Sequence, residues 1–318
     1  MNDVEIIIDN QGVFYNPLVE EGITWETERE GTPGKLEFKV VNDKKIDFQE
    51  GNPVILKYKG NDIFYGFVFK KSRDKEQIIS VTAYDQLRYL KNKDRYNYKD
   101  KTTNQLIQML AEDFNLKCGI LEDTVYPISH LEDNTTLFDM ILYSMQETTR
   151  LTGNIFIFYD DFGKLTLKNL ENMKLDCLIS ENTAQNFKYE SSIDGETYNK
   201  IKLVYENSET KKREIYITKD TENINKWGVL QKYETINKED NGALKADVML
   251  KLYNQKRRSL TINGAFGDIR VRGGSLIPVI LTLGDIDAKS YLMVTKVKHK
   301  FNNNEHTMDL TLRGDVFV

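Results

Sequence analysis

Short stretches in the first part of the chain alternate between apolar and polar residues. Leu36, Phe38 and Val40 share one side of such a stretch, which is the two-residue period of a half-buried strand. Similar stretches are separated by turns rich in Gly, Asn and Asp and predict strands at 5–9, 23–27, 35–40, 53–58, 63–69 and 77–84. Six short strands joined by such turns favour an antiparallel barrel or sandwich.

The period changes to that of a helix after about residue 97. Apolar residues at helical spacing predict two helices, and a hairpin is expected to follow them. The expected elements are helices at 102–114 and 134–149 and strands at 154–159 and 164–167. The residues expected to cap the helix starts are Thr102 or Thr103 and Asn134 or Thr135. This part of the chain therefore reads as a small α+β module.

The remainder of the chain returns to strands and contains one predicted helix. The expected elements are strands at 198–205, 213–218, 259–262, 275–281, 290–297 and 307–312 and a helix at 241–254. The whole chain is thus expected to be mainly β with an α+β module.

The two strand-rich ends resemble each other. Four segments of the first end recur in the same order in the second. The matches are 36–38 with 260–262, 53–56 (Pro-Val-Ile-Leu) with 278–281, 65–68 with 291–294, and 79–83 with 308–312. The ordered series predicts two related antiparallel β-barrel (tube) domains flanking a small helix-containing domain. The expected domains are 1–96, 97–185 and 186–318, the last with one helix.

The composition excludes several classes of protein. The 318 residues carry a net charge of −5, whereas a general nucleic-acid binder needs a basic excess. Two cysteines cannot form a disulfide framework, and apolar runs fall far short of the ~20 residues of a membrane span. The N-terminus has no basic region of a secretory signal. We therefore expect a protein made in a reducing cytosol that contacts no membrane and no specific nucleic-acid sequence.

An ordered set of segments resembles the XkdQ/YqbQ-like phage tail baseplate hub family, and more distantly the late-control protein D group and the central hub proteins of contractile tails. The segments that carry the resemblance are 27–38, 48–54, 64–68, 81–90, 198–203 and 268–275. None of them is a catalytic signature, so the resemblance lies in the set and covers nearly the whole chain.

The resemblance implies a structural hub protein of a contractile phage tail or a phage-tail-like bacteriocin. It implies a homotrimer whose paired barrels form a pseudo-hexameric ring between the hexameric tail tube and the trimeric spike. The implied partners are the tail tube or tube-initiator protein, the spike, baseplate wedge proteins and the tape-measure protein. The implied place is the baseplate of a particle assembled in the bacterial cytoplasm and released by lysis, and DNA could pass through the ring.

Signatures of catalysis are missing from the sequence. It has no G-x-S-x-G, H-E-x-x-H, P-loop, G-x-G-x-x-G or C-x-x-C motif. Of the three histidines, His130 is expected at the surface or at a helix cap, His299 half-buried on a strand and His306 in a turn, with no metal-ligand spacing between any two. Cys118 and Cys177 are expected to be inert core or half-buried thiols. We therefore assign no catalytic, cofactor-binding or metal-binding residue and expect no enzyme and no cofactor.

Two other functions stay open. A peptidoglycan hydrolase would need two acids across a cleft, and a carbohydrate-binding component of the tail tip would need none. The acid pairs available to a hydrolase are Glu20 with Glu21, Asp160 with Asp161, and Asp285 with Asp287. All of them lie in predicted turns, where acidic residues are common.

The remaining candidates are surface features. Lys296, Lys298 and Lys300 alternate on one strand face, with Lys70 and Arg73 at the equivalent place in the first repeat. They either meet acidic partner subunits or form a solvated face that protects a sheet edge. Other candidates are the two tryptophans, as core residues or interface anchors, and a set of glycines expected in turns. These residues are Trp25, Trp227, Gly264, Gly267, Gly273 and Gly274.

Overall fold

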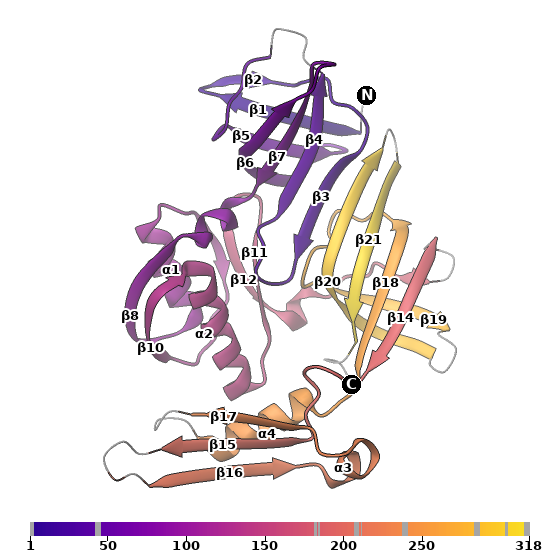
Figure 1. Cartoon of the computed structure of the whole chain (residues 1–318). Helices are drawn as coiled ribbons and strands as arrows, with labels where there is room; N and C mark the ends of the chain where they lie inside the picture. The colour runs from indigo at the N-terminus through magenta and orange to yellow at the C-terminus, as the bar shows by residue number, and fades with distance from the viewer. Residues whose placement is uncertain are drawn as a thin grey trace.

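The computed structural model describes residues 3–41, 46–180, 183, 185–206, 210, 212–236, 241–282, 287–302 and 305–314. The chain is mainly β, as expected (Figure 1). One large, mostly antiparallel sheet runs through both ends of the chain, and three small sheets lie outside it. No helix in the described ranges is long and apolar enough to span a membrane.

The first repeat is built from the N-terminal strands, which follow the predicted alternation closely. These strands are β1 (Val4–Asn10), β2 (Val13–Tyr15), β3 (Ile23–Glu28), β4 (Lys35–Val41), β5 (Pro53–Tyr58), β6 (Asn61–Arg73) and β7 (Ile78–Tyr84). Their inward residues form one core that includes Trp25, Leu36, Phe38 and Val54.

The helical part follows as a compact module below the first repeat (Figure 1). Its elements are the 3-10 helix η1 (Gln86–Lys91), β8 (Lys93–Lys101), α1 (Thr103–Asp113), β9 (Cys118–Leu121), β10 (Ile128–Thr136), α2 (Leu137–Thr152), β11 (Phe156–Asp160), β12 (Leu165–Asn169) and the 3-10 helix η2 (Leu170–Met173). The cap of α2 is Thr136, whose hydroxyl accepts from the Asp139 amide (3.0 Å). The predicted caps Asn134 and Thr135 are wrong because β10 continues to Thr136 through its pairing with β8.

A separate three-stranded sheet lies at the far end of the molecule (Figure 1). It comprises β15 (Lys200–Glu206), β16 (Arg213–Lys219) and β17 (Gln231–Thr235), with α3 (Thr221–Trp227) and α4 (Gly242–Tyr253). The sequence predicts one helix after residue 186, which is α4. The helix α3 was not predicted, because it spans seven residues of which none is buried and therefore has no apolar stripe.

The second repeat completes the large sheet. Its strands are β13 (Ile179–Ser180), β14 (Asn186–Ser192), β18 (Arg257–Phe266), β19 (Leu276–Thr282), β20 (Asp287–Asn302) and β21 (Glu305–Arg313). They surround a second core that includes Leu260, Val279, Val294 and Leu310.

The two repeats pair their strands in the same order. In the first, β3-β4-β7-β6-β5 are neighbours, and in the second, β14-β18-β21-β20-β19 are neighbours. Each long strand carries a bulge at the same place, at Phe69 in β6 and at Thr295 in β20. The sequence repeat therefore describes a structural repeat.

The register confirms most of the sequence matches and corrects one. Three residues meet in a row across the sheet in each repeat. The rows are Leu36, Ala83 and Val68 in the first and Leu260, Leu312 and Val294 in the second. The match of the two Pro-Val-Ile-Leu segments is wrong by two residues, because Pro53 lies opposite Phe67 whereas Pro278 lies opposite Tyr291.

The expected closed barrels are not formed by the strand pairings of the described residues. In each repeat the first part of the long strand pairs with one neighbour and the part after the bulge pairs with another. The sheet thus folds over its own core without joining its outer edges. What joins instead is one repeat to the other, through β3 and β20.

Candidate functional site: the β3–β20 seam and the open sheet edges

The seam between the repeats is an antiparallel strand pair. Six residue pairs join β3 to β20, from Lys296 opposite Glu28 to Phe301 opposite Ile23. The amide of Arg29 extends the ladder by donating to the carbonyl of the bulge residue Thr295 (2.9 Å). Lys296 Nζ contacts Glu26 Oε1 and Glu28 Oε1, each at 2.9 Å. These two carboxylates raise the pKa of Lys296 and keep it charged.

A glycine pair lets a loop of the second repeat approach β3. The Gly273 amide donates to Thr27 Oγ1 (2.9 Å). A Cβ atom on Gly273 would lie 2.3 Å from the Glu28 carbonyl carbon, so any side chain would force the backbones apart. Gly273 was expected to serve a turn, and it also allows the backbone of its loop to lie against the backbone of β3.

Buried aromatic and imidazole rings stack beneath the seam. Trp25 stacks on His299 at 4.7 Å, and His306 stacks on Phe301 at 4.4 Å. His299 Nδ1 and His306 Nε2 lie 2.9 Å apart, and His299 Nε2 donates to the Val271 carbonyl. His299 is fully buried rather than half-buried, and His306 is buried in β21 rather than lying in a turn.

The histidine pair is neutral at physiological pH. Burial lowers the pKa of His299 to about 3, aided by His306, and burial lowers the pKa of His306 to about 4. The direct hydrogen bond places no metal ion between the rings, and the described residues contain no group of three or more metal-ligating side chains. His130 stacks on Tyr143 at 4.3 Å, half-exposed as expected.

The strands that correspond to β3 and β20 in the other repeat are β14 and β6, and in the described residues each has an edge without a partner strand. In the described part of the chain, β14 pairs only with β18, and the segment of β6 after its bulge pairs only with β7. Phe187 on β14 is 39% exposed, whereas Ile23 at the corresponding place on β3 is 4% exposed. Lys70 and Arg73 lie on the open part of β6 and are exposed.

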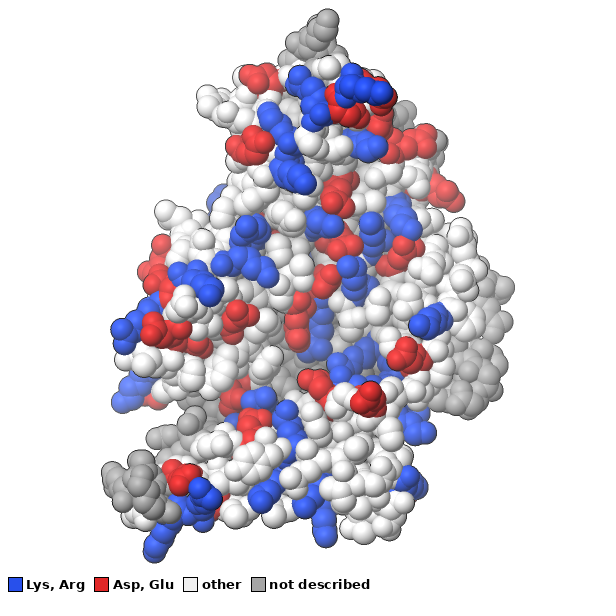
Figure 2. Space-filling view, in the orientation of Figure 1, with Lys and Arg blue, Asp and Glu red and all other residues white. Residues whose placement is uncertain are grey.

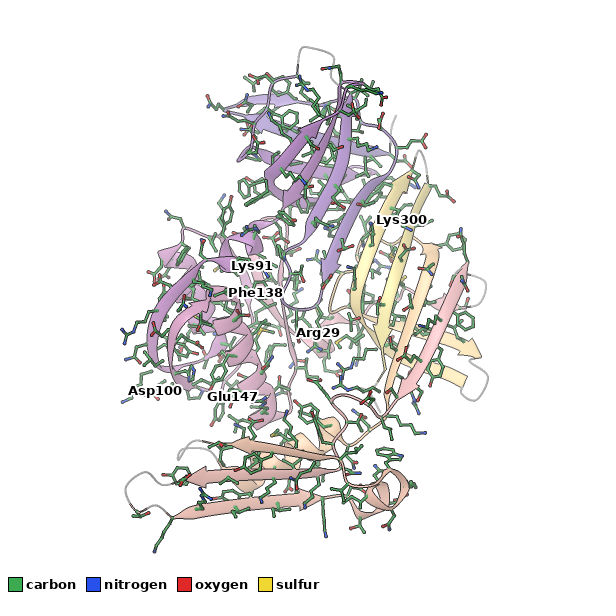
Figure 3. All side chains as sticks on the ribbon, viewed as in Figure 1. Arg29, Lys91, Asp100, Phe138, Glu147 and Lys300 are labelled. Carbon is green, nitrogen blue, oxygen red and sulfur yellow. The ribbon has the colours of Figure 1, made fainter. Side chains whose placement is uncertain are left out.

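The lysines of β20 belong largely to the seam and the hairpin. Lys296 pairs with two glutamates of β3, and Lys300 pairs with Asp309 on β21, close to the first repeat (Figure 3). Charges of both signs are interspersed over the face shown in Figure 2. This arrangement supports neither a uniform basic wall nor a phosphate-binding surface.

The neighbouring acids Asp160 and Asp161 lie in different surroundings. Burial raises the pKa of Asp160 to about 6, while Asp161 is exposed beside Arg272 (3.5 Å). Sequence analysis missed Asp85, whose buried carboxylate accepts from the amides of Gly34 (2.8 Å) and Leu87 (3.0 Å). Burial and then Asp160 raise the pKa of Asp85 well above its ordinary value. The Asp85 carboxyl joins η1 to the first repeat through Gly34, and Arg272 joins the second repeat to β11 by donating to the Asp160 backbone carbonyl (2.9 Å).

The other acidic candidates are surface groups or fall outside the description. Glu20 lies on a loop at 3.8 Å from Lys39, and Glu21 beside it is exposed. Asp285 lies outside the described residues, and Asp287 begins β20.

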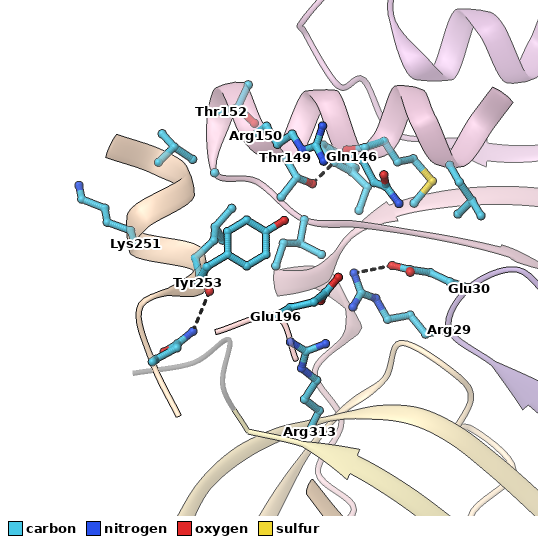
Figure 4. A pocket seen from close by; sticks show the side chains of 18 of the residues that line it. Arg29, Glu30, Gln146, Thr149, Arg150, Thr152, Glu196, Lys251, Tyr253 and Arg313 are labelled. Carbon is cyan, nitrogen blue, oxygen red and sulfur yellow. Dashed lines mark hydrogen bonds and ion pairs between the residues drawn. The ribbon is translucent and has the colours of Figure 1, made fainter. Parts of the chain in front are cut away.

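A cavity of about 670 Å³ lies between α2, α4 and the second repeat (Figure 4). Its lining carries the carboxylates Glu30 and Glu196 together with several arginines. Glu30 pairs with Arg29 (2.7 Å). Burial acts to raise the pKa of Glu196, but the cations around it, Arg257 before Arg313 and Lys232, together outweigh burial and lower it. A general acid needs a raised pKa, so the Glu196 carboxylate is unsuited to that role.

The cysteines and tryptophans have structural surroundings. Cys177 is half-buried, and burial followed by Asp268 raises its pKa to about 11. Cys118 lies on β9 and is exposed, which differs from the expected core or half-buried position, and partial burial of its thiol raises its pKa. Trp25 is a core residue and Trp227 ends the surface helix α3.

Comparison with known proteins fits this architecture. The 43 kDa tail protein of prophage MuSo2 from Shewanella oneidensis aligns with a TM-score of 0.72 and 14% identity, covering 97% of this chain and 98% of that one. The E. coli c3393 protein, a component of the type VI secretion system with structural similarity to T4 tail proteins gp27 and gp5, aligns with a TM-score of 0.57 and 13% identity. That alignment covers 96% of this chain and 76% of c3393. The chain therefore has the fold of phage tail proteins.

The family follows from sequence. The model of the YQBQ-like family matches residues 23–313, so the chain belongs to that family, as the sequence resemblance implied. The phage-like element PBSX protein XkdQ of Bacillus subtilis (strain 168) is 29% identical over 304 residues, which cover 92% of each protein.

Proposed function

We propose that the protein is a structural hub subunit of a contractile phage tail or a phage-tail-like particle. Three copies form a pseudo-hexameric ring that joins the hexameric tail tube to the trimeric spike. The observation that carries this proposal is the structural repeat, because each chain contains the same strand arrangement twice and joins the two copies edge to edge.

The strand order supports a continuous ring wall. In each chain β14-β18-β21-β20-β3-β4-β7-β6 form a run of eight neighbouring strands, so three copies would supply 24 strands. The run is composed of two similar units, so a threefold assembly of chains has six similar units around its axis. Such a ring matches a sixfold tube on one side and a threefold spike on the other.

The named relatives support a role in a tail. XkdQ is a protein of a phage-like element, and c3393 resembles the tail proteins gp27 and gp5. By this proposal the protein resides in the baseplate and works by geometry, without catalysis. Its partners are the tail tube or tube-initiator protein, the spike, baseplate wedge proteins and the tape-measure protein, and DNA passes through the ring if the particle carries a genome.

The proposal keeps the three parts expected from sequence, 1–96, 97–185 and 186–318, and shifts their limits to follow the packing. Leu87 of η1 lies in the core of the helical module, and Ile179 of β13 lies in the core of the second repeat. The tube-like units are therefore β1–β7 and the large-sheet strands from β13 onward, and the middle domain from η1 to η2 decorates the outside of the ring. The sheet of β15–β17 is an additional part of the third unit that also lies on the outside.

Light scattering on the purified chain tests the proposal. The expected mass of the protein alone is three times the chain mass of 37.0 kDa. If the chain forms a trimer only on its partners, the complex with the tube and spike proteins of the same particle is expected to contain three copies of the chain. A chain that stays monomeric with both partners present overturns the proposal. Clearing of a cell-wall zymogram by the purified chain, lost in Asp160→Asn, would support a hydrolase instead.

A further inference from the structure

We infer that the open edge of β14 in one copy pairs with the open part of β6 in the next copy, in the register that β3 and β20 use within the chain. The inference rests on the proposed trimer and adds the residues that make its interface. It follows from the structural repeat, because the seam shows how one unit is joined to the next.

The correspondence of β14 to β3 is fixed by their shared neighbour. Trp25 on β3 lies opposite Leu36, and Tyr189 on β14 lies opposite Leu260, the counterpart of Leu36. Tyr189 is therefore the counterpart of Trp25. One residue further along, Glu190 is the counterpart of Glu26.

The correspondence of β6 to β20 is fixed by the bulge. Lys70 and Lys296 each follow the bulged residue, and they lie opposite Thr82 and Thr311. Lys70 is therefore the counterpart of Lys296.

Applying the register of β3 and β20 to β14 and β6 predicts which residues lie opposite each other between copies. At the seam, Lys296 lies opposite Glu28 and the following three residues of β20 face the preceding three of β3. The expected pairs between copies are Lys70 with Ser192, Lys71 with Ser191, Ser72 with Glu190, and Arg73 with Tyr189. The counterpart of the Arg29 bond is a hydrogen bond from the Ile193 amide to the Phe69 carbonyl.

The charges on the two edges are complementary in this register. Lys296 Nζ lies 2.9 Å from Glu26 Oε1, although these residues are diagonal neighbours on the two strands. Lys70 and Glu190 occupy the same diagonal and carry the same charges. The seam ion pair is therefore repeated between copies.

One residue on β6 differs in character from its counterpart at the seam, because a lysine, Lys71, replaces an apolar residue. Lys71 occupies the place of the buried Val297. Its Nζ donates to the Phe48 carbonyl and lies over the Phe48 ring, so its charge is directed to its own unit. The side chains that face the neighbouring copy on the outer face are Lys70 and Ser72.

Exposure of both edges in the single chain supports pairing. Unpaired strand edges promote association unless they are covered. Phe187 near this edge of β14 is 39% exposed, whereas its counterpart Ile23 at the seam is only 4% exposed. Pairing between copies from Tyr189 to Ser192 would satisfy the backbone groups of both edges.

Cysteine cross-linking tests the register. The variant Ser72→Cys with Glu190→Cys, in a chain carrying Cys118→Ser, is expected to form disulfide-linked dimers and trimers on oxidation, because the two residues face each other directly. A register-shifted control, Ser72→Cys with Ser192→Cys, is expected to cross-link at least tenfold more slowly.

Charge reversal provides a second test of the same contact. Lys70→Glu is expected to raise the dissociation constant of the trimer by about tenfold, and adding Glu190→Lys is expected to restore it. A stable trimer without the Ser72–Glu190 cross-link and without charge rescue overturns this inference and leaves the proposed hub intact. A chain that is monomeric with tube and spike proteins overturns both.

Discussion

The buried histidine pair makes a sharp prediction about pH and stability. His306 is neutral in the folded chain, with a pKa near 4, while an unfolded histidine has a pKa of about 6.5. As the pH falls below 6.5, the unfolded chain takes up a proton that the folded chain does not. Stability is therefore lost between pH 6.5 and about pH 4, and it is unaffected above this range.

The size of the effect follows from these pKa values. At pH 5 the pH lies about 1.5 units below the pKa of an unfolded histidine, and each unit stabilises the protonated unfolded chain by about 1.4 kcal/mol. Each buried neutral histidine therefore lowers the free energy of unfolding by about 2 kcal/mol between pH 8 and pH 5. His299 has the same sign, because its Nε2 donates to the Val271 carbonyl and its Nδ1 faces His306. The pair thus removes about 4 kcal/mol of stability at pH 5.

The perturbation that isolates this effect is His306→Gln, which keeps an amide donor at the same place. We expect its free energy of unfolding, measured with urea at pH 8, 7, 6 and 5, to fall by about 2 kcal/mol less than that of the wild type over this range. The raised pKa of Asp160, about 6, means that its protonation stabilises the folded chain as the pH falls. This contribution is the same in both proteins. The difference between the proteins therefore reports the loss of the buried His299–His306 pair.

The matched control is His130→Gln at a half-exposed position. It removes a histidine outside the buried pair and so separates the effect of losing His306 from that of losing a histidine elsewhere. If His306→Gln and the wild type lose the same free energy between pH 8 and pH 5, the buried neutral pair is refuted.

Three further predictions concern a close backbone contact, a helix cap and a buried ion pair. Gly273→Ala is expected to lower the free energy of unfolding by about 1–3 kcal/mol, because its Cβ atom would overlap Glu28; thermal unfolding measures the loss. Thr136→Ala is expected to cost about 1 kcal/mol of urea stability through loss of the α2 cap, while Thr135→Ala changes it by less than about half of that. Lys245→Ala removes one of the two cations that pair with the buried Glu147 and leaves Arg150 in place, so it is expected to cost about 2 kcal/mol by calorimetry, and an unchanged midpoint would contradict the buried ion pair.

The ion pair of Lys245 and Glu147 joins two parts of the chain. Lys245 on α4 lies 2.9 Å from Glu147 Oε2, which is on the face of α2 that points to the β15–β17 sheet (Figure 3). Arg150 adds a contact from α2 to Glu234 on β17 (2.9 Å). These contacts fix the far sheet to the helical module, which the proposal places on the outside of the ring.

Much of the fold follows from local pattern in the sequence. Strands with one buried face, such as β4 and β7, alternate cleanly, and α1 and α2 carry apolar stripes. The elements that were missed lack such a pattern. β8 is largely polar and exposed because only β10 covers it, and β14 is exposed because one of its edges is open.

The site was less accessible to sequence reasoning because it depends on contacts between distant residues. His299 and His306 are brought together by the β20–β21 hairpin, and Asp85 meets Asp160 only after the helical module packs on the sheet. The Pro-Val-Ile-Leu match failed since a two-residue shift keeps the same side chains on the same face of a strand. The bulges at Phe69 and Thr295, which fix the true register, have no distinct sequence signal.

Electron microscopy of the assembled hub shows how its chains meet. We expect a ring of three chains whose inner wall has 24 strands, with β14 of each chain beside β6 of the next. A ring of six chains, or a trimer whose chains meet through other surfaces, would contradict it.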